Sequence, residues 1–299
     1  AIEAKYIPKS EKESYLKGEK VKEFKREVSK EDRKHVQICV NWILINQNKE
    51  NNFWNYYYGK DDNKTRFDFS VTQYAALGIS AALRMGHKLP AGYVKDYVNS
   101  TVDYQMPKGP EINVVHEHKP GKRKDRTTYS RNPIEARGWD YLYKGTWAES
   151  SEKTNAYGSM TCAGLTTLLC GLDNAAQMDR KAWAKEFKSQ QKYFKWKSAA
   201  NKSLIGGNAW MERWFSVTRN PNKGRSHYYY YLYSLERIAM MQDIRYLGVH
   251  DWYWEGASAL VELQDSDGNW GAGFADTCFA LLFLKRGTVR IQDVTTGDR

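Results

Sequence analysis

Apolar residues recur at helical spacing along most of the chain. In residues 30–47 they form a single stripe, which alternates with charged and polar positions. Ser29 precedes this stripe as a cap, and Glu31 places negative charge in the first turn. The pattern predicts an amphipathic helix whose apolar stripe consists of Val36, Cys39, Val40, Ile43 and Leu44.

The same spacing predicts helices along the rest of the chain. No stretch has the continuous apolar runs of a parallel sheet, so the pattern predicts an all-α fold. Residues 179–198 and 203–215 are expected to form two helices, and Gly206 and Gly207 are expected to break the start of the second. Besides residues 30–47, helices are predicted for residues 91–105, 179–198, 203–215, 228–241 and 255–263. Two further helices begin near Ser70 and Ser159. A last helix contains the apolar run 278–284 and begins at Asp276 and Thr277.

Glutamine, a turn and tryptophan follow several of these helices. Gln264 ends one helix, and the turn at Gly268 then leads to Trp270. A glutamine amide can satisfy free backbone groups at a helix end, and an indole ring can cover that end while its N–H finds an acceptor. Gln47 with Trp54 repeats the pattern, with Asn52 in the glycine position. Gln105 with Trp139 is a third copy, split by an insertion.

The helix after each copy opens with a threonine: Thr72, Thr161 and Thr277. A small residue follows three positions later in each helix, and such residues let helices approach closely. The copies are unevenly spaced, as in a degenerate repeat with insertions.

The last copy resembles the repeat of the squalene cyclase and prenyltransferase superfamily, which Gly256, Leu260, Gln264, Gly268 and Trp270 match position for position. The text from Tyr230 to Arg237 looks closest to uncharacterised bacterial proteins with prenyltransferase and squalene-oxidase repeats. The resemblance covers residues 30–287 and implies an α/α toroid, a ring of helical hairpins that is incomplete or degenerate here.

The catalytic motifs of that superfamily are missing from the sequence. There is no Asp-x-Asp-Asp acid and no Asp-rich magnesium motif. In the zinc-binding relatives, Cys162 would match the cysteine ligand, but Met160 and Asp276 stand where the aspartate and histidine belong. We therefore expect no metal and no cofactor, with a Cys162–Asp276 pair as the remaining alternative. Whether the chain is an enzyme stays open, and the missing motifs weigh against it.

Three groups of residues are candidates for a site. Glu236, Arg237, His250 and Asp251 could form either a structural ion-pair and capping network or a catalytic cluster, to which Asp276 is a further weak candidate. Aromatic residues nearby could line a cavity or simply pack: Tyr229, Tyr230, Tyr233, Trp252 and Trp254. His116 and His118 could chelate a metal from a strand, or belong to a solvated loop.

Charge and composition divide the chain into an N-terminal arm, a domain with an insertion, and a C-terminal tail. Residues 106–135 form a basic insertion, either loop or hairpin, within a domain at 30–287. Residues 1–29 form a charged arm and 288–299 a tail. The net charge of +11 allows an acidic partner, anionic lipid or nucleic acid, and a solvated basic surface is the simpler explanation. The four cysteines, Cys39, Cys162, Cys170 and Cys278, lie in apolar text and are expected to be free and mostly buried.

Two functions follow as hypotheses. The first is a noncatalytic toroid that acts as a scaffold for partner proteins or assembles with copies of itself. The second is an enzyme or carrier that holds an apolar, isoprenoid-like molecule in an aromatic cavity. Binding of an acidic glycan by the insertion is a weaker idea. Nucleic acid is not expected as a partner, and no segment reaches membrane-spanning length. The start at Ala1 fits a secreted or periplasmic protein, or equally a trimmed chain from the cytoplasm.

Overall fold

The computed structural model describes residues 28–56, 68–121, 124–141, 156–178 and 180–288. Most of the predicted N-terminal arm and nearly all of the tail lie outside these residues. The described residues are mostly helical, which confirms the predicted all-α class. Their nine helices are α2 (Lys30–Ile45), α3 (Phe69–Arg84), α4 (Ala91–Asp103), α5 (Gly158–Gln177), α6 (Arg180–Phe187), α7 (Gln190–Arg213), α8 (Tyr228–Met241), α9 (Trp252–Leu263) and α10 (Phe274–Lys285).

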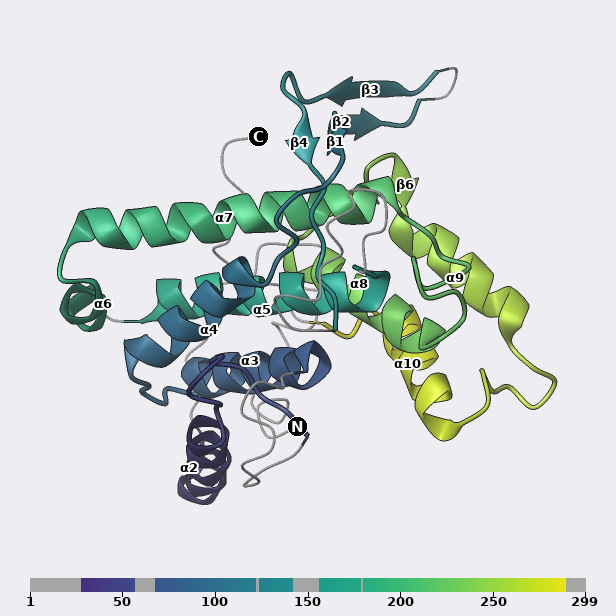
Figure 1. Cartoon of the computed structure of the whole chain (residues 1–299). Coiled ribbons are helices and arrows are strands. Elements are labelled where there is room, and N and C mark those ends of the chain that lie inside the picture. The colour runs from purple at the N-terminus through teal and green to yellow at the C-terminus, as the bar shows by residue number, and fades with distance from the viewer. Residues whose placement is uncertain (1–27, 57–67, 122–123, 142–155, 179, 289–299) are drawn as a thin grey trace.

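Short antiparallel pairs complete the secondary structure. In the insertion, β2 (Val115–Lys119) pairs with β3 (Arg126–Tyr129), and β1 (Glu111–Ile112) pairs with β4 (Ile134–Glu135) at their base. This hairpin stands off the helices (Figure 1). A smaller pair, β5 (Tyr246–Leu247) with β6 (His250–Asp251), lies between α8 and α9.

The helices form two rows. In the inner row, α3, α5, α8 and α10 contact one another in chain order. On the outside, α2 contacts α3, α4 and α7 contact α5, and α9 contacts α8 and α10 (Figure 1). The core therefore centres on α5, which has eighteen of its twenty residues buried.

Glycines allow α5 to be covered so closely. A Cβ atom added at Gly164 would lie 2.4 Å from the ring of Trp139, and one at Gly171 would lie 2.2 Å from Val98. These distances are shorter than van der Waals contact, so any larger residue would push the neighbouring elements apart.

The expected interruption at Gly206 and Gly207 is wrong. The structure has one helix, α7, through both glycines, and the break comes earlier, at Lys188, which has a φ of 57°. Tertiary packing explains the difference, because a Cβ at Gly207 would be 2.7 Å from both Leu165 and Trp139. The glycines therefore serve close packing, which offsets their low helix propensity.

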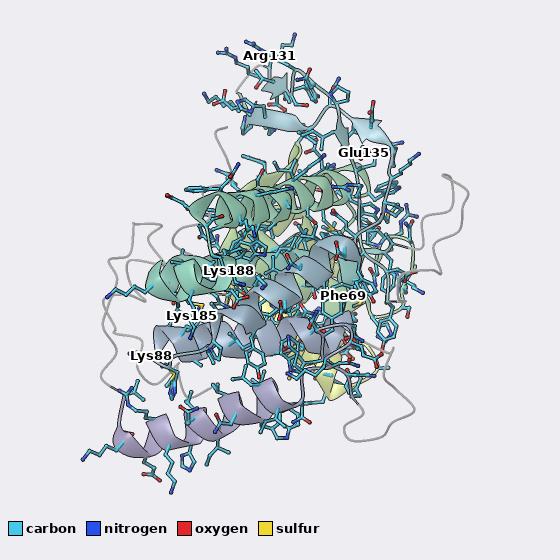
Figure 2. The ribbon with its side chains drawn as sticks, turned by 60° about the vertical axis from the view of Figure 1, so that its left-hand side comes forward. Phe69, Lys88, Arg131, Glu135, Lys185 and Lys188 are labelled. Carbon is cyan, nitrogen blue, oxygen red and sulfur yellow. The ribbon has the colours of Figure 1, made fainter. Side chains whose placement is uncertain are left out.

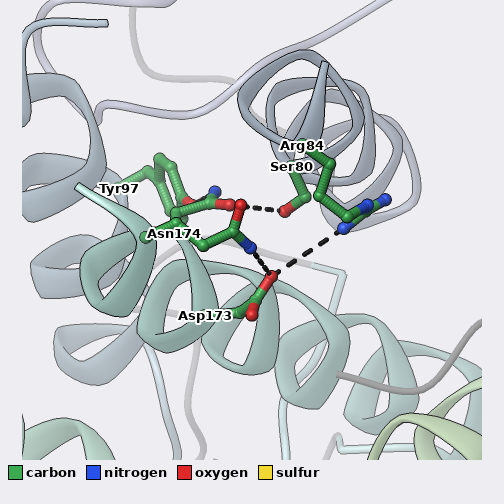
Figure 3. Close-up of polar contacts among 6 residues, drawn as sticks. Ser80, Arg84, Tyr97, Asp173 and Asn174 are labelled. Carbon is green, nitrogen blue, oxygen red and sulfur yellow. Dashed lines mark hydrogen bonds and ion pairs between the residues drawn. The ribbon is translucent and has the colours of Figure 1, made fainter. Parts of the chain in front are cut away.

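A buried polar network joins α3, α4 and α5 (Figure 3). Ser80 Oγ donates to Asn174 Oδ1 at 2.8 Å, and Asn174 Nδ2 donates to the Tyr97 hydroxyl at 3.0 Å. Next to it, Arg84 lies 3.8 Å from the Asp173 carboxylate. Both polar atoms of the Asn174 side chain are therefore hydrogen-bonded, one to α3 and one to α4, so the network fixes the relative position of the three helices.

The four cysteines are free, as expected, but they are not uniformly buried. Cys162 and Cys170 are buried on α5, whereas Cys39 is exposed and Cys278 is half-buried. On α2 only Val36 and Val40 are buried, and Cys39 lies on the solvent-exposed side of the helix. No helix in the described ranges combines the length and the apolar character needed to cross a bilayer.

Candidate functional site

Three tryptophans fasten the helix pairs together. The indole Nε1 of Trp54 donates to the carbonyl of Ile43 at 2.7 Å. Trp139 donates in the same way to Thr101 at 2.8 Å, and Trp270 to Leu260 at 2.7 Å. Each acceptor belongs to the last turns of the preceding helix, where carbonyls lack intrahelical partners.

The glutamines close the turn that leads to each tryptophan. Gln47 Nε2 donates to Asn52 O at 2.8 Å, and Gln264 Nε2 donates to Gly268 O at 2.9 Å. Asn52 and Gly268 have φ values of 62° and 81°, so asparagine does take the left-handed glycine position. Gln105 Nε2 closes the split copy by donating to Arg137 O at 2.8 Å.

Threonines lock each tryptophan to the helix that follows. The backbone N–H groups of Trp54, Trp139 and Trp270 donate to the Oγ1 atoms of three threonines, at 3.2, 3.2 and 3.0 Å respectively. The acceptors are Thr72, Thr161 and Thr277. We call each glutamine, tryptophan and threonine set a corner.

A pocket of about 830 Å³ lies beyond the corners. It opens over the first turns of α3, α5 and α8 and reaches α10, so all four helices of the inner row contribute to its wall. Tyrosines and polar groups make up its wall, which consists of Tyr56, Ser70, Tyr74, Asp140, Tyr141, Tyr157, Ser159, Met160, Asn222, Lys223, His227, Tyr230 and Phe279.

The corners themselves place part of this wall. Tyr56 lies two residues after Trp54, and Tyr141 lies two residues after Trp139. Tyr74 and Phe279 each lie two residues after a corner threonine. Because the corners fix the backbone at these points, they also fix where the rings stand.

Beneath the pocket, a series of hydrogen bonds links α8 to α3. Arg237 is buried and donates from Nη1 to Gln73 Oε1 at 2.6 Å. Its guanidinium also stacks on Tyr233 and Tyr74, with 4.4 and 5.1 Å to the ring centroids. Within the residues described, no carboxylate forms an ion pair with Arg237. Its charge is therefore balanced by an amide dipole and two ring faces.

This series of hydrogen bonds ends at the pocket. A guanidinium can only donate, so the oxygen of Gln73 must face Arg237 and its NH₂ group must face away. That NH₂ group donates to the Tyr230 hydroxyl oxygen. Tyr230 thus accepts from Gln73, and its own hydrogen remains available for an acceptor in the pocket.

Three of the wall tyrosines are held as neutral phenols at physiological pH. Burial raises the pKa of Tyr74, Tyr157 and Tyr230 above the usual value near 10. A neutral phenol both donates and accepts, and its ring face is apolar. Lys223 lies over the Tyr157 ring, 4.6 Å from its centroid, which places one cation at the rim.

The four residues proposed as one polar cluster have separate partners. Glu236 accepts two hydrogen bonds from Thr288, at 2.7 and 3.1 Å, while Arg237 bonds to Gln73. His250 lies 3.0 Å from Glu255 and stacks on Phe215. Asp251 caps α9 through the Trp254 N–H. The described contacts therefore resemble a set of caps and structural ties.

The candidate aromatic residues are also divided. Tyr230 lines the pocket, and Tyr233 stacks on the lining residue Phe279, with 5.5 Å between ring centroids. Tyr229 packs edge-on against Tyr228. Trp252 donates to the Ile244 carbonyl at 2.8 Å, while Trp254 is 71% exposed. Trp252 and Trp254 are not among the pocket residues.

Each of the residues considered for metal binding has contacts of another kind. Burial raises the pKa of the Cys162 thiol, whose sulfur lies 3.8 Å from Met211 Sδ, and Asp276 accepts from Ala272 N. His118 bonds to Thr127, with a β-bulge between it and Val115. In the described part of the chain, no three histidine, cysteine or acidic residues come together as a metal-binding group.

Most residues of the wall were not predicted from the sequence. Tyr56, Tyr141 and Tyr157 lie in loops with no periodic pattern, as do Asp140 and Lys223. The sequence did contain a clue to Tyr56 and Tyr141, because each lies two residues after a corner tryptophan. The chain matches no protein-family model, no curated protein and no solved structure.

Proposed function

We propose that this chain is a noncatalytic binding domain that holds a polyhydroxylated ligand, such as an oligosaccharide, in the tyrosine-lined pocket. The hairpins would form an incomplete α/α toroid around that ligand. The sequential contacts of α3, α5, α8 and α10, together with a pocket that all four line, support this arrangement.

The mixed chemistry of the wall carries the proposal. Sugars present apolar C–H faces and a rim of hydroxyls, which phenol rings and polar side chains match together. Five tyrosines supply ring faces and hydroxyls, while Asp140 and Asn222 add acceptors and donors. Tyr230 adds a donor whose direction Gln73 fixes.

A purely hydrocarbon ligand fits this wall less well. Covering a phenol hydroxyl or a carboxylate without a hydrogen-bonding partner costs about 1–3 kcal/mol for each group. The isoprenoid-like alternative would therefore need its own oxygen atoms opposite these groups. A glycan supplies them along its whole length.

Binding is a better expectation than hydrolysis. Glycoside hydrolysis generally needs two carboxyl groups that face each other across the scissile bond. Among the described residues of the wall, Asp140 is the only carboxylate, and its Oδ1 already accepts from Tyr141 N at 2.6 Å.

Binding can be tested by titrating the full chain with neutral and acidic oligosaccharides and with farnesol, using tryptophan fluorescence and calorimetry. We expect Tyr74→Ala to weaken sugar binding on the order of tenfold, as for a central aromatic contact. Tyr129→Ala, which removes an exposed ring from the insertion hairpin (56% exposed, against 42% for Tyr74), should leave the affinity unchanged. Saturable binding of farnesol without any sugar binding would favour the isoprenoid alternative and refute the glycan.

A protein-interaction domain is the second candidate, because apolar side chains are exposed at both ends of the helix array. On α2, Ile45 is 77% exposed and Trp42 is 49% exposed. On α10, Phe274 is 86% exposed. Light scattering across a concentration series tests self-assembly: a dimer that Trp42→Glu or Phe274→Glu dissociates would support this function, and a monomer at all concentrations would exclude assembly with copies of itself.

A further inference from the structure

The strongest charge on the molecule lies away from the pocket, on α6 and the first half of α7. Residues 181–202 contain seven lysines and one acidic residue, Glu186. That is a net charge of +6 in 22 residues, out of +11 for the whole chain. Lys95 of α4 bonds to Glu186, so the one carboxylate of the segment is already neutralised.

The lysines face outward together. On α7, Lys192, Lys195 and Lys202 are spaced along one side of the helix, and all three are exposed. Lys185 and Lys188 are also exposed, where α6 leads into α7 (Figure 2). In the described ranges, none of these five lysines forms an ion pair. We call these five residues the lysine face.

An aromatic cluster holds this face rigidly. The rings of Trp183 and Trp196 lie 5.5 Å apart, and Phe187 lies 5.4 Å from Trp196. Trp183 also donates its indole N–H to the Ala175 carbonyl at 2.9 Å, which ties α6 to α5. One ring remains outside the cluster, because Phe194 is 55% exposed next to Lys195.

We propose that the lysine face docks on an anionic lipid surface. A group of four to eight basic residues on a helix matches the field of anionic headgroups. Lysine stems can lie along the apolar boundary while their ammonium groups reach the headgroups. Phe194 supplies the aromatic side chain that enters the interface at the edge of such a patch. The helices would lie on the membrane without crossing it.

Two features favour lipid over nucleic acid. The described cations of the face are lysines, which act as point charges, whereas phosphate recognition in nucleic acids favours the planar fork of arginine. Single-stranded nucleic acids also need a row of stacking rings, whereas among the described rings of α6 and the first half of α7 only Phe194 is largely exposed.

Flotation of the full chain with liposomes tests the proposal. The probes are vesicles of phosphatidylcholine alone and vesicles in which one-third of the lipid is phosphatidylglycerol. We expect binding to the anionic vesicles only, with a steep loss of binding as salt rises. Each lysine removed should weaken binding about fivefold, so Lys185→Gln, Lys192→Gln and Lys195→Gln combined should weaken it roughly a hundredfold.

The matched control removes three charges from the insertion instead. Lys108→Gln, Lys124→Gln and Arg131→Gln all change exposed residues, so this variant has the same net charge as the first. It should keep most of the binding, and circular dichroism checks that both variants fold. Equal losses in the two variants would overturn the lysine face. No binding to anionic vesicles, or tighter binding to duplex DNA or heparin, would overturn the lipid surface.

Discussion

Arg237 on α8 donates a hydrogen bond to Gln73 on α3, 2.6 Å away and out of contact with solvent. The two residues are 164 positions apart in the chain, so the bond joins two members of the inner row that are not neighbours in sequence. The Gln73 side-chain oxygen accepts from the buried guanidinium, while the NH₂ group of the same amide donates to the hydroxyl of Tyr230.

Replacing the acceptor should expose the cost of that buried charge. We expect Gln73→Leu to lower the free energy of unfolding by about 3 kcal/mol, because the guanidinium loses its hydrogen-bond acceptor. Removing both partners in Gln73→Leu/Arg237→Leu should cost less than the sum of the single changes. Urea unfolding of the four proteins in this cycle measures the difference, and simple additivity would show that the bond is energetically unimportant.

The corner threonines provide a second prediction. Thr161→Val keeps the side-chain shape but removes the acceptor of the Trp139 backbone N–H, which is buried. We expect a loss of about 1–3 kcal/mol in the free energy of unfolding. Thr277→Val should cost less, because Thr277 is only half-buried. Thermal unfolding of these two variants and of Thr72→Val measures the losses. Unfolding midpoints equal to that of the wild type in all three variants would contradict a stabilising role for the corner threonines.

A pair of glycines on the last hairpin tests its packing. A Cβ at Gly256 would lie 2.4 Å from the ring of Phe283, whereas one at Gly273 would meet nothing within 4 Å. Gly256→Ala should therefore destabilise the fold by about 1–3 kcal/mol through overpacking. Gly273→Ala should cost less, because its methyl group meets no neighbour and the only loss is that of glycine at the N-cap of α10. Equal midpoints in chemical unfolding would argue against close packing of α9 on α10.

Glu236 makes stability depend on pH. Burial raises the pKa of this carboxyl to about 7, although its hydrogen bonds from Thr288 act in the opposite direction. An unfolded glutamate titrates near pH 4.3, so between about pH 4.5 and 7 the folded state binds more protons than the unfolded state. Stability should therefore fall as pH rises through this window, by about 3 kcal/mol for this group.

The matching variant is Glu236→Gln, which removes the titration and keeps an acceptor for Thr288 N. It should flatten the loss of stability between pH 4.5 and 7 and make the protein more stable than the wild type at pH 8. Glu262→Gln at an exposed position controls for the lost negative charge. An unchanged slope in Glu236→Gln would show that Glu236 ionises freely in the fold.

Local patterns predicted the helices and the residues of the corners, because a helix end and a turn depend on neighbours in sequence. Asn52 was identified in the left-handed position for this reason. The continuous helix through Gly206 and Gly207 was not, since its reason is the ring of Trp139 and the side chain of Leu165. The pocket was also missed, because Tyr56, Asp140 and Lys223 come together only when distant loops meet.

The split corner has a practical consequence for engineering this chain. Gln105 and Trp139 still close their turn although the β1–β4 insertion separates them, so closure depends on the glutamine amide reaching Arg137 and tolerates extra chain between them. The strand pair β1–β4 brings the two ends of the inserted segment side by side. A foreign domain with neighbouring termini could replace the hairpin there, and the other two corners are candidate graft points for the same reason.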